Sequence, residues 1–298
     1  MGHLLAVVID GIIYSSWLFI IAVGLTLIYG VMKILNLAHG SFYALGAYAA
    51  ASLVGRWLSG GHAPYGSYAM LILAAILVGL VVGPLIERGL LRFMYGKDEI
   101  VLVLVTYAVF LILEDAIKLV WGVDAYFVSG PYGLLGSMSI AGLTYPVYSA
   151  ALVVVSLLIG AAFALALNRT RQGKLLTAVI QDREISAAMG IDVRRVYLVT
   201  FTVGTMLAAT GGALTAPTVS VVPGMGVEVI VLAFAVVVIG GLGSFAGAAL
   251  GSLIVGMVQS AAVHYLPAVE LFSIYLVMAA VLIARPKGLF RALEARKI

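Results

Sequence analysis

Apolar blocks long enough to cross a membrane recur along almost the whole chain, and they restrict its fold more than any other feature. A spanning helix needs about 20 mainly apolar residues. Such blocks occur at 5–31, 37–55, 67–87, 100–120, 147–167, 196–216, 229–243, 246–264 and 268–284. The block at 229–243 is short, and only glycines separate it from the next one. The sequence therefore predicts an all-α, polytopic helical membrane protein with about eight transmembrane helices plus one candidate short or broken helix.

The composition excludes several classes of protein. Hydrophobic residues make up 63% of the chain and charged residues 10%, against about 25% charged residues in soluble domains. We expect residues 1–298 to form a single transmembrane domain in the lipid bilayer, because no linker or second domain is visible. The net charge of +4 is concentrated in loops, which argues against nucleic-acid binding. The chain has no Cys and its four His are far apart, so neither a disulfide nor a metal site is predicted.

Basic residues predict the orientation in the membrane. Loops rich in Lys and Arg face the cytoplasm, and the polar stretch 168–195 holds six of the seventeen such residues. If this stretch is cytoplasmic, fifteen of the seventeen, all but Arg56 and Lys118, fall on that side. They include the basic residues of the C-terminal tail, Arg285, Lys287, Arg291, Arg296 and Lys297. The N-terminus, which has no Lys or Arg, would then lie outside.

The polar stretch has the pattern of a short amphipathic helix over Leu175–Met189. Its apolar positions are Leu175, Leu176, Val179, Ile180, Ile185 and Met189. Gly190 follows where a left-handed cap would end the helix. A cytoplasmic helix between two membrane spans suggests a docking element for a protein outside the membrane. The alternative is a solvated loop that only satisfies the rules of membrane insertion.

Two glycine-rich stretches have two interpretations each. In Gly30–Gly46, Lys33, Asn36 and His39 interrupt an apolar run. This is either a discontinuous helix lining a translocation path or a tight surface turn, with Asn36 capping the second span. In Gly240–Gly256, glycine recurs every four residues at Gly243, Gly247 and Gly251. This spacing is typical of helix packing, whereas Gly240, Gly241 and Gly243 could instead form an unwound segment facing a substrate.

Three ionisable residues interrupt the fourth block. An ionisable residue inside a span is a candidate functional site, and Glu114, Asp115 and Lys118 all qualify. Glu114 and Lys118 have the spacing of an ion pair on one helix face, which favours a structural role.

Several chemistries have no residues to perform them. The sequence has no phosphate-binding loop ending in Gly-Lys-Ser or Gly-Lys-Thr, no His-Glu-x-x-His pair and no Gly-x-Ser-x-Gly turn. We therefore expect a protein that is not an enzyme and does not itself hydrolyse ATP.

The sequence resembles the permease subunits of branched-chain amino acid ABC importers, the LivH-like group. Four stretches carry the resemblance in order, over essentially the whole chain. They are Asn36–Gly40 with Leu45–Tyr48, Gln181–Asp182 through Ala187–Ile191, Gly240–Ser244 with Gly247, Ala248 and Gly251, and Arg285–Phe290. Related permeases transport branched-chain amino acids, urea, short amides or aromatic acids.

The resemblance implies partners and roles. It implies a second, LivM-like permease, two ATPase subunits that hold ATP and Mg, and a periplasmic substrate-binding protein. It places the chain in the bacterial inner membrane, with the N-terminus periplasmic and the C-terminus cytoplasmic. The ATPase-coupling residues are then Gln181, Asp182, Arg183, Glu184, Ala187, Ala188 and Gly190. The candidates for the substrate pathway are Asn36, His39, Gly40, Tyr43, Glu114, Gly240, Gly241 and Gly243. A stand-alone secondary transporter or channel is the alternative, and a membrane enzyme is a more distant one.

Overall fold

The computed structural model describes residues 2–290, so Arg291, Arg296 and Lys297 of the basic tail lie outside the described residues. The long helices are α1 (Gly2–Met32), α2 (His39–Ser59), α3 (Ser67–Gly89), α4 (Glu99–Trp121), α6 (Val147–Arg169), α9 (Val193–Thr215), α10 (Met225–Gly240), α11 (Phe245–Tyr265) and α12 (Glu270–Ala284). The shorter helices are η1 (Pro64–Gly66), η2 (Leu91–Phe93), α5 (Gly130–Gly133), α7 (Arg171–Gln181), α8 (Arg183–Ala188) and η3 (Pro267–Val269). Strands β1 (Ser137–Ile140) and β2 (Leu143–Pro146) form one antiparallel hairpin.

Each predicted apolar block corresponds to one long helix, which confirms the prediction of a polytopic helical membrane protein. Six helices of the described chain, α1, α3, α4, α6, α9 and α11, are long and apolar enough to cross a membrane. Helices α10 and α12 are apolar but shorter. Helix α2 has 21 residues, but Gly, Ala, Ser and Tyr dilute its hydropathy, and most of its side chains are buried. The predicted count of about eight spans is loosely consistent with this arrangement.

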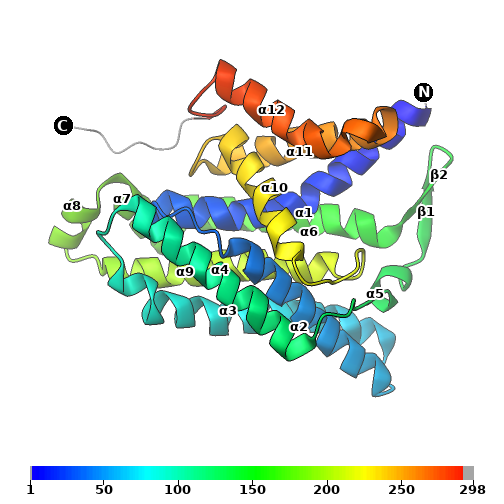
Figure 1. Cartoon of the computed structure of the whole chain (residues 1–298), viewed down its shortest axis with the longest axis horizontal. Coiled ribbons are helices and arrows are strands. Elements are labelled where there is room, and N and C mark those ends of the chain that lie inside the picture. Colours follow the sequence, from blue (N-terminus) through cyan, green and yellow to red (C-terminus); the bar gives the residue numbers. More distant parts are fainter. Residues whose placement is uncertain (1, 291–298) are drawn as a thin grey trace.

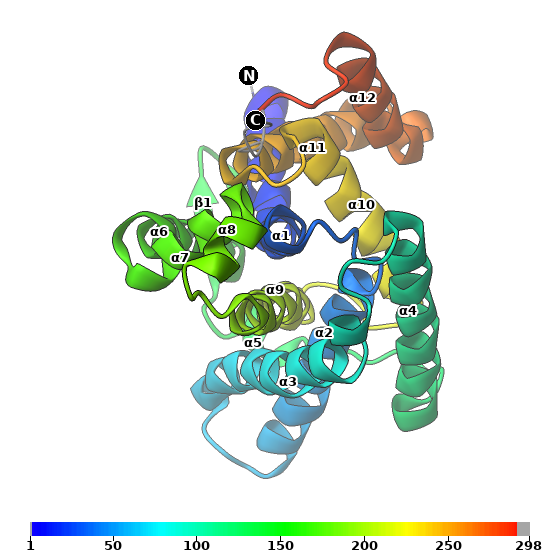
Figure 2. The same ribbon diagram turned by 90° about the vertical axis from the view of Figure 1, so that its left-hand side faces the viewer.

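The helices form one bundle around α1, α2 and α9. Helix α1 packs against α11, α9 and α6, while α9 also packs against α3 and α2. The helices α7 and α8 lie at the left end of the bundle in Figure 1, and the β1–β2 hairpin lies at the right. Helix α1 begins at the right and α12 ends at the left, so the described chain starts and finishes at opposite ends of the bundle (Figure 1). Figure 2 shows the bundle from the end that carries α7 and α8.

Small residues let neighbouring helices approach until their backbones touch. A Cβ atom on Gly46 of α2 would overlap the backbone of Ala209 in α9, and one on Gly212 of α9 would overlap the carbonyl of Tyr43. Helices α10 and α11 pack in the same way, because a Cβ on Gly247 would meet the carbonyl of Gly240. Helices in membranes associate mainly through such packing, since lipid tails are as apolar as Leu.

The α10–α11 contact predicts the effect of adding a single methyl group. A Cβ on Gly251 of α11 would overlap the carbonyl oxygen of Val236 in α10. Gly251→Ala should therefore lower the stability of the purified protein by about 1–3 kcal/mol through overpacking, measured as the thermal unfolding midpoint in detergent. The control is Gly55→Ala on α2, where a Cβ meets no atom within 4 Å. That variant should be stabilised by up to about 1 kcal/mol through helix propensity. Equal shifts in the two variants would contradict the packing argument.

Candidate functional site

The segment between α1 and α2 turns back into the bundle. The Nε2 atom of His39, the first residue of α2, lies 3.0 Å from the carbonyl oxygen of Ile21. Ile21 precedes the last residue of α1, Met32, by eleven residues, which is about 16 Å of helix. Residues 33–38 cover this distance without helical structure, and Ile34, Asn36 and Ala38 are fully buried. Helix α2 therefore begins deep inside the protein, as the discontinuous-helix interpretation requires.

Side chains satisfy the backbone of this buried segment. The hydroxyl of Thr106 on α4 accepts a hydrogen bond from the Leu37 amide at 3.3 Å and lies 3.1 Å from the Leu35 carbonyl oxygen. The Asn36 side-chain oxygen accepts from the Ala38 amide at 3.2 Å. Irregular backbone within a membrane is tolerated only where protein or water pairs its polar groups. The prediction of Asn36 as the helix cap is wrong, because Ala38 occupies that position.

Helix α10 begins against the start of α2, with Met225 and Gly226 buried and Val227 and Glu228 exposed. Its cap residue, Gly224, has a left-handed φ of 89°. A Cβ on Gly40 of α2 would overlap the carbonyl of Gly226, and a Cβ on Gly226 would come within 2.8 Å of the Gly40 carbonyl oxygen. The first turns of α2 and α10 are thus in backbone contact. We call this region, with Glu114 beside it, the helix-start junction.

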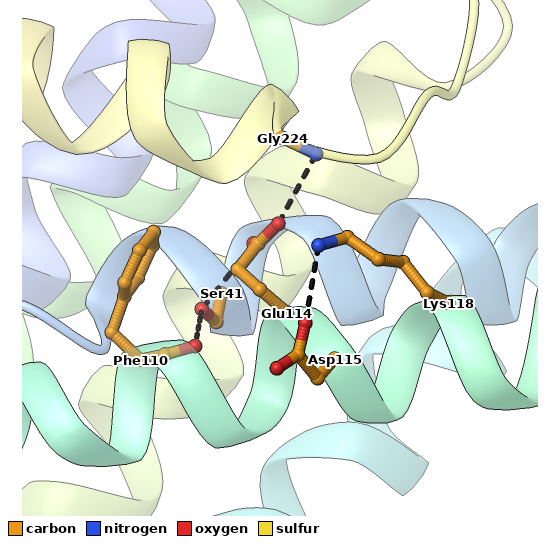
Figure 3. A network of polar contacts seen from close by, with 6 residues as sticks. All are labelled: Ser41, Phe110, Glu114, Asp115, Lys118 and Gly224. Carbon is orange, nitrogen blue, oxygen red and sulfur yellow. Dashed lines mark hydrogen bonds and ion pairs between the residues drawn. The ribbon is translucent and has the colours of Figure 1, made fainter. Parts of the chain in front are cut away.

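Glu114 of α4 joins the helix-start junction through hydrogen bonds (Figure 3). Its carboxylate is buried, with 6% of the residue exposed, and its Oε2 atom accepts from the Gly224 amide at 3.1 Å. Ser41 of α2 lies 3.5 Å from Glu114 Oε1 and donates to the Phe110 carbonyl at 3.3 Å. A carboxylate is favoured there because the N-terminus of a helix carries partial positive charge.

The predicted pairing of Glu114 with Lys118 is wrong. Lys118 instead contacts Asp115, with 3.1 Å between Nζ and Oδ1, and 73% of the Asp115 side chain is exposed. Figure 3 shows the two carboxylates pointing to different partners. Glu114 is therefore buried without an ion-pair partner among residues 2–290.

The structure brings some predicted pathway residues together and separates others. The helix-start junction contains or adjoins Asn36, His39 and Gly40. Tyr43 lies one turn further along α2, and its hydroxyl forms a hydrogen bond of 2.6 Å with the hydroxyl of Thr215 on α9. Gly240, Gly241 and Gly243 lie at the other end of α10, fourteen or more residues from Gly226, which is about 20 Å away. Sequence reasoning missed Ser41, Thr106, Gly224 and Gly226. Thr106 could have been noticed as a polar residue in mid-block.

The chain's final described segment holds the far end of α10. The Leu289 and Phe290 amides donate to the carbonyls of Ile239 and Gly240, both at 2.9 Å. Gly241 and Gly243 have φ values of 106° and 80°, and a Cβ on Gly241 would overlap the carbonyl of Phe290. The glycine motif and the closing motif therefore meet in one contact. Gly240–Gly243 forms a tight connection between α10 and α11.

The predicted amphipathic helix at 175–189 is two helices, α7 and α8, which we call the lever. Asp182 divides them because its backbone is extended and its carboxylate accepts from the Ile185 amide at 2.8 Å. Gly190 ends α8 with a φ of 85°, which confirms the predicted left-handed cap. Two of the lever's predicted apolar positions, Ile185 and Met189, are largely exposed, at 55% and 78% of their surfaces.

The lever presents its predicted coupling residues to solvent and contacts the bundle behind them. The exposed residues are Gln181, Asp182, Arg183, Glu184, Ala187, Ala188 and Gly190. The Arg183 guanidinium lies 5.6 Å from the centre of the Tyr197 ring on α9. Tyr197 packs edge-on against Tyr95, whose hydroxyl donates to Glu87 of α3. Burial, together with the bond to Glu87, raises the pKa of Tyr95, so this hydroxyl keeps its proton.

Comparisons with known proteins identify relatives of the whole chain. A family described as "Branched-chain amino acid transport system / permease component" matches residues 7–285. The chain is 28% identical to the high-affinity branched-chain amino acid transport permease BraD of Pseudomonas aeruginosa, over 87% of this chain and 86% of the relative. It is 32% identical to a probable branched-chain amino acid transport permease, LivH, of Methanocaldococcus jannaschii, over 86% and 80%. It is 25% identical to LivH of Escherichia coli, over 97% and 96%. No solved structure matches significantly.

Glu114 is predicted to stabilise the helix-start junction. Glu114→Ala removes the acceptor of the Gly224 amide and should cost about 1.5–3 kcal/mol, as for hydrogen bonds to charged groups. Asp115→Ala, on the same helix, breaks an exposed ion pair and should cost less than about 1 kcal/mol. Thermal unfolding of both purified variants measures the difference. If Asp115→Ala is the more damaging variant, the assignment of Glu114 is incorrect.

Thr106 is predicted to hold the buried segment 33–38 through its hydroxyl. Thr106→Val keeps the shape but leaves the Leu37 amide and Leu35 carbonyl without this partner, so it should destabilise the protein by about 1–3 kcal/mol. Thr106→Ser keeps the hydroxyl and should recover most of that loss. The measurement is again the unfolding midpoint, and a Ser variant no better than the Val variant would show that packing, not hydrogen bonding, matters here.

Proposed function

Because this chain belongs to the family of permease components of branched-chain amino acid transport systems, we propose that it forms one transmembrane half of an ATP-driven importer. Its solute would be a branched-chain amino acid or a related small amino-acid-like, amide or carboxylate compound. The observation that carries the mechanism is the exposed lever, which presents the apolar side chains of Ile185, Ala187 and Ala188 at one end of an otherwise membrane-embedded bundle. Such a surface suits a protein partner.

In this mechanism, ATP is bound and hydrolysed outside the chain. Two ATPase subunits would hold ATP and Mg and dock on the lever of this chain and on that of a second, LivM-like permease. Movement of α8 would reach the bundle through Arg183, Tyr197 and Tyr95. The end of the bundle with the lever would be cytoplasmic. The start of α1 would face the periplasm of a bacterium, where a substrate-binding protein delivers the solute.

The helix-start junction is our candidate for the part of the solute pathway that opens and closes during transport. Helices that begin inside a membrane protein direct their N-termini at the carboxylate groups of substrates in other transporters. The α2 start provides such an end, and the Glu114 carboxylate, which occupies the α10 start, offers a partner for an ammonium group. An amino acid carries both charges, so this set of groups fits its chemistry. Asn36, His39 and Gly40 would line the approach.

The docking role of the lever is tested by Ala188→Trp. Ala188 is exposed on α8, so a bulky side chain should leave the fold intact but block a close-fitting partner. We expect co-purification of the ATPase subunits to fall at least tenfold, and ATP-dependent uptake to fall with it. The matched control is Ala268→Trp, at an exposed position of η3, which should retain the ATPase. Normal assembly and uptake by Ala188→Trp would refute the docking role, and uptake without any ATPase would refute the importer mechanism.

A further inference from the structure

A cavity of about 870 Å³ lies beneath the lever. Helices α1, α6 and α9 form apolar walls, and α7 closes the cavity with its own Leu residues. The wall residues used below are Leu27, Phe163, Leu167, Val196, Val199 and Val203. The volume falls within the range of small-molecule sites, about 300–1,000 Å³. The apolar walls therefore suit a bound apolar group.

Two arginines stand at the edge of the same cavity, at the N-termini of two helices. Arg171 is the first residue of α7, and Arg195 lies in the first turn of α9. Helix N-termini already carry partial positive charge, so basic residues there oppose helix stability. Neither helix has an acidic residue in its first turn. The Asp192 carboxylate at the cap position of α9 offsets part of this charge. The two arginines still leave the edge of the cavity positive overall, which favours binding of an anion.

Two of the remaining polar residues of the cavity cap helices. Asp192 accepts from the Arg195 amide at 3.1 Å and Thr170 accepts from the Gly173 amide at 3.0 Å, so both act as helix caps. Thr200, on the α9 wall, is different. It is 1% exposed, and its hydroxyl has no hydrogen-bond partner among residues 2–290. That hydroxyl is itself shielded from the cavity, so it offers no contact to a ligand, and recognition of an anion there depends on Arg171 and Arg195.

We propose that this cavity binds an anionic phospholipid. The phosphate lies between Arg171 and Arg195, and an acyl chain runs along the walls past Phe163 and Val199. A lipid fits better than free phosphate because most of the lining is apolar. It also has direct access, because the neighbouring outer face of α6 exposes Leu157, Leu158 and Leu165. Basic pockets between membrane helices are a known type of binding site for anionic headgroups.

This lipid would support the lever. Leu175 and Leu176 of α7 line the cavity, so an acyl chain below them would fill the space between α7 and the bundle. Close-packed groups transmit displacement, so an acyl chain held there would couple a movement of α7 to α9. The transport activity of the assembled importer should therefore depend on anionic lipid.

The test measures lipid affinity of the full chain in detergent, by titration with dioleoyl phosphatidylglycerol and with dioleoyl phosphatidylcholine. The wild type should prefer the anionic lipid. The double variant Arg171→Gln/Arg195→Gln should bind it on the order of 30-fold more weakly, the loss expected for two cations. The matched control, Arg169→Gln/Arg194→Gln, removes two neighbouring charges that do not line the cavity and should keep its affinity within about threefold. Equal losses in the two variants would overturn the proposal in favour of diffuse surface charge.

Two further measurements separate the lipid from other occupants. Val199→Trp fills the cavity while keeping both arginines, and it should reduce phosphatidylglycerol binding at least tenfold. Unchanged binding by this variant would place the lipid elsewhere. Inorganic phosphate should not displace the lipid, and the assembled importer should keep its preference for the anionic lipid. Displacement by phosphate would overturn the lipid assignment, and loss of the site on assembly would show that a partner protein fills it.

Discussion

The need to pair every backbone polar group away from water governs the centre of this structure. Helix α2 begins inside the bundle, and α10 begins against it with one side of its first turn buried. Each start leaves amide groups without helical partners. Asn36 and Thr106 supply acceptors to the segment before α2, and Glu114 supplies one to Gly224 before α10. Without these side chains an internal helix start would cost several kcal/mol in a membrane. The helix-start junction is stable because Asn36, Thr106 and Glu114 accept hydrogen bonds from these amide groups.

This same requirement makes α10 a rigid element held at both ends. Glu114 and the Gly40–Gly226 contact fix its first turn, and the Leu289 and Phe290 amides fix its last carbonyls. Between these points the glycines of α11 bring the two helices into backbone contact. Close-packed helices of this kind do not deform gradually. Any change of shape at the helix-start junction must therefore move whole helices and exchange one set of contacts for another.

The sequence predicts local and periodic features of this protein well, and long-range ones poorly. The lengths of the apolar blocks were sufficient to locate the nine long helices of the described chain. The position of Gly190 was sufficient to predict where α8 ends. The depth of residues 33–38 was not predictable, because the Thr106 hydroxyl that makes it possible is about seventy positions away. Glu114 was predicted to pair with Lys118 because helix spacing reveals only neighbours on the same helix. Its actual partner, the Gly224 amide, lies 110 residues further along the chain. The division of the lever was missed because the apolar pattern continues across Asp182, whose capping bond breaks the helix.

The contacts between the lever and the helix-start junction form a continuous path through α9. Arg183 of α8 meets Tyr197 near the start of α9, and four residues later Phe201 packs edge-on against Phe42 of α2. Further along α9, Ala209 and Gly212 contact the backbone of Gly46 and Tyr43. Helix α9 therefore touches the lever at one end and α2 along much of its length, so a displacement of α9 must move α2. Because the first turn of α2 is in backbone contact with that of α10, such a displacement reaches the Glu114 carboxylate. Alternating access then requires no flexible relay, only two stable positions of α9 relative to α1 and α3.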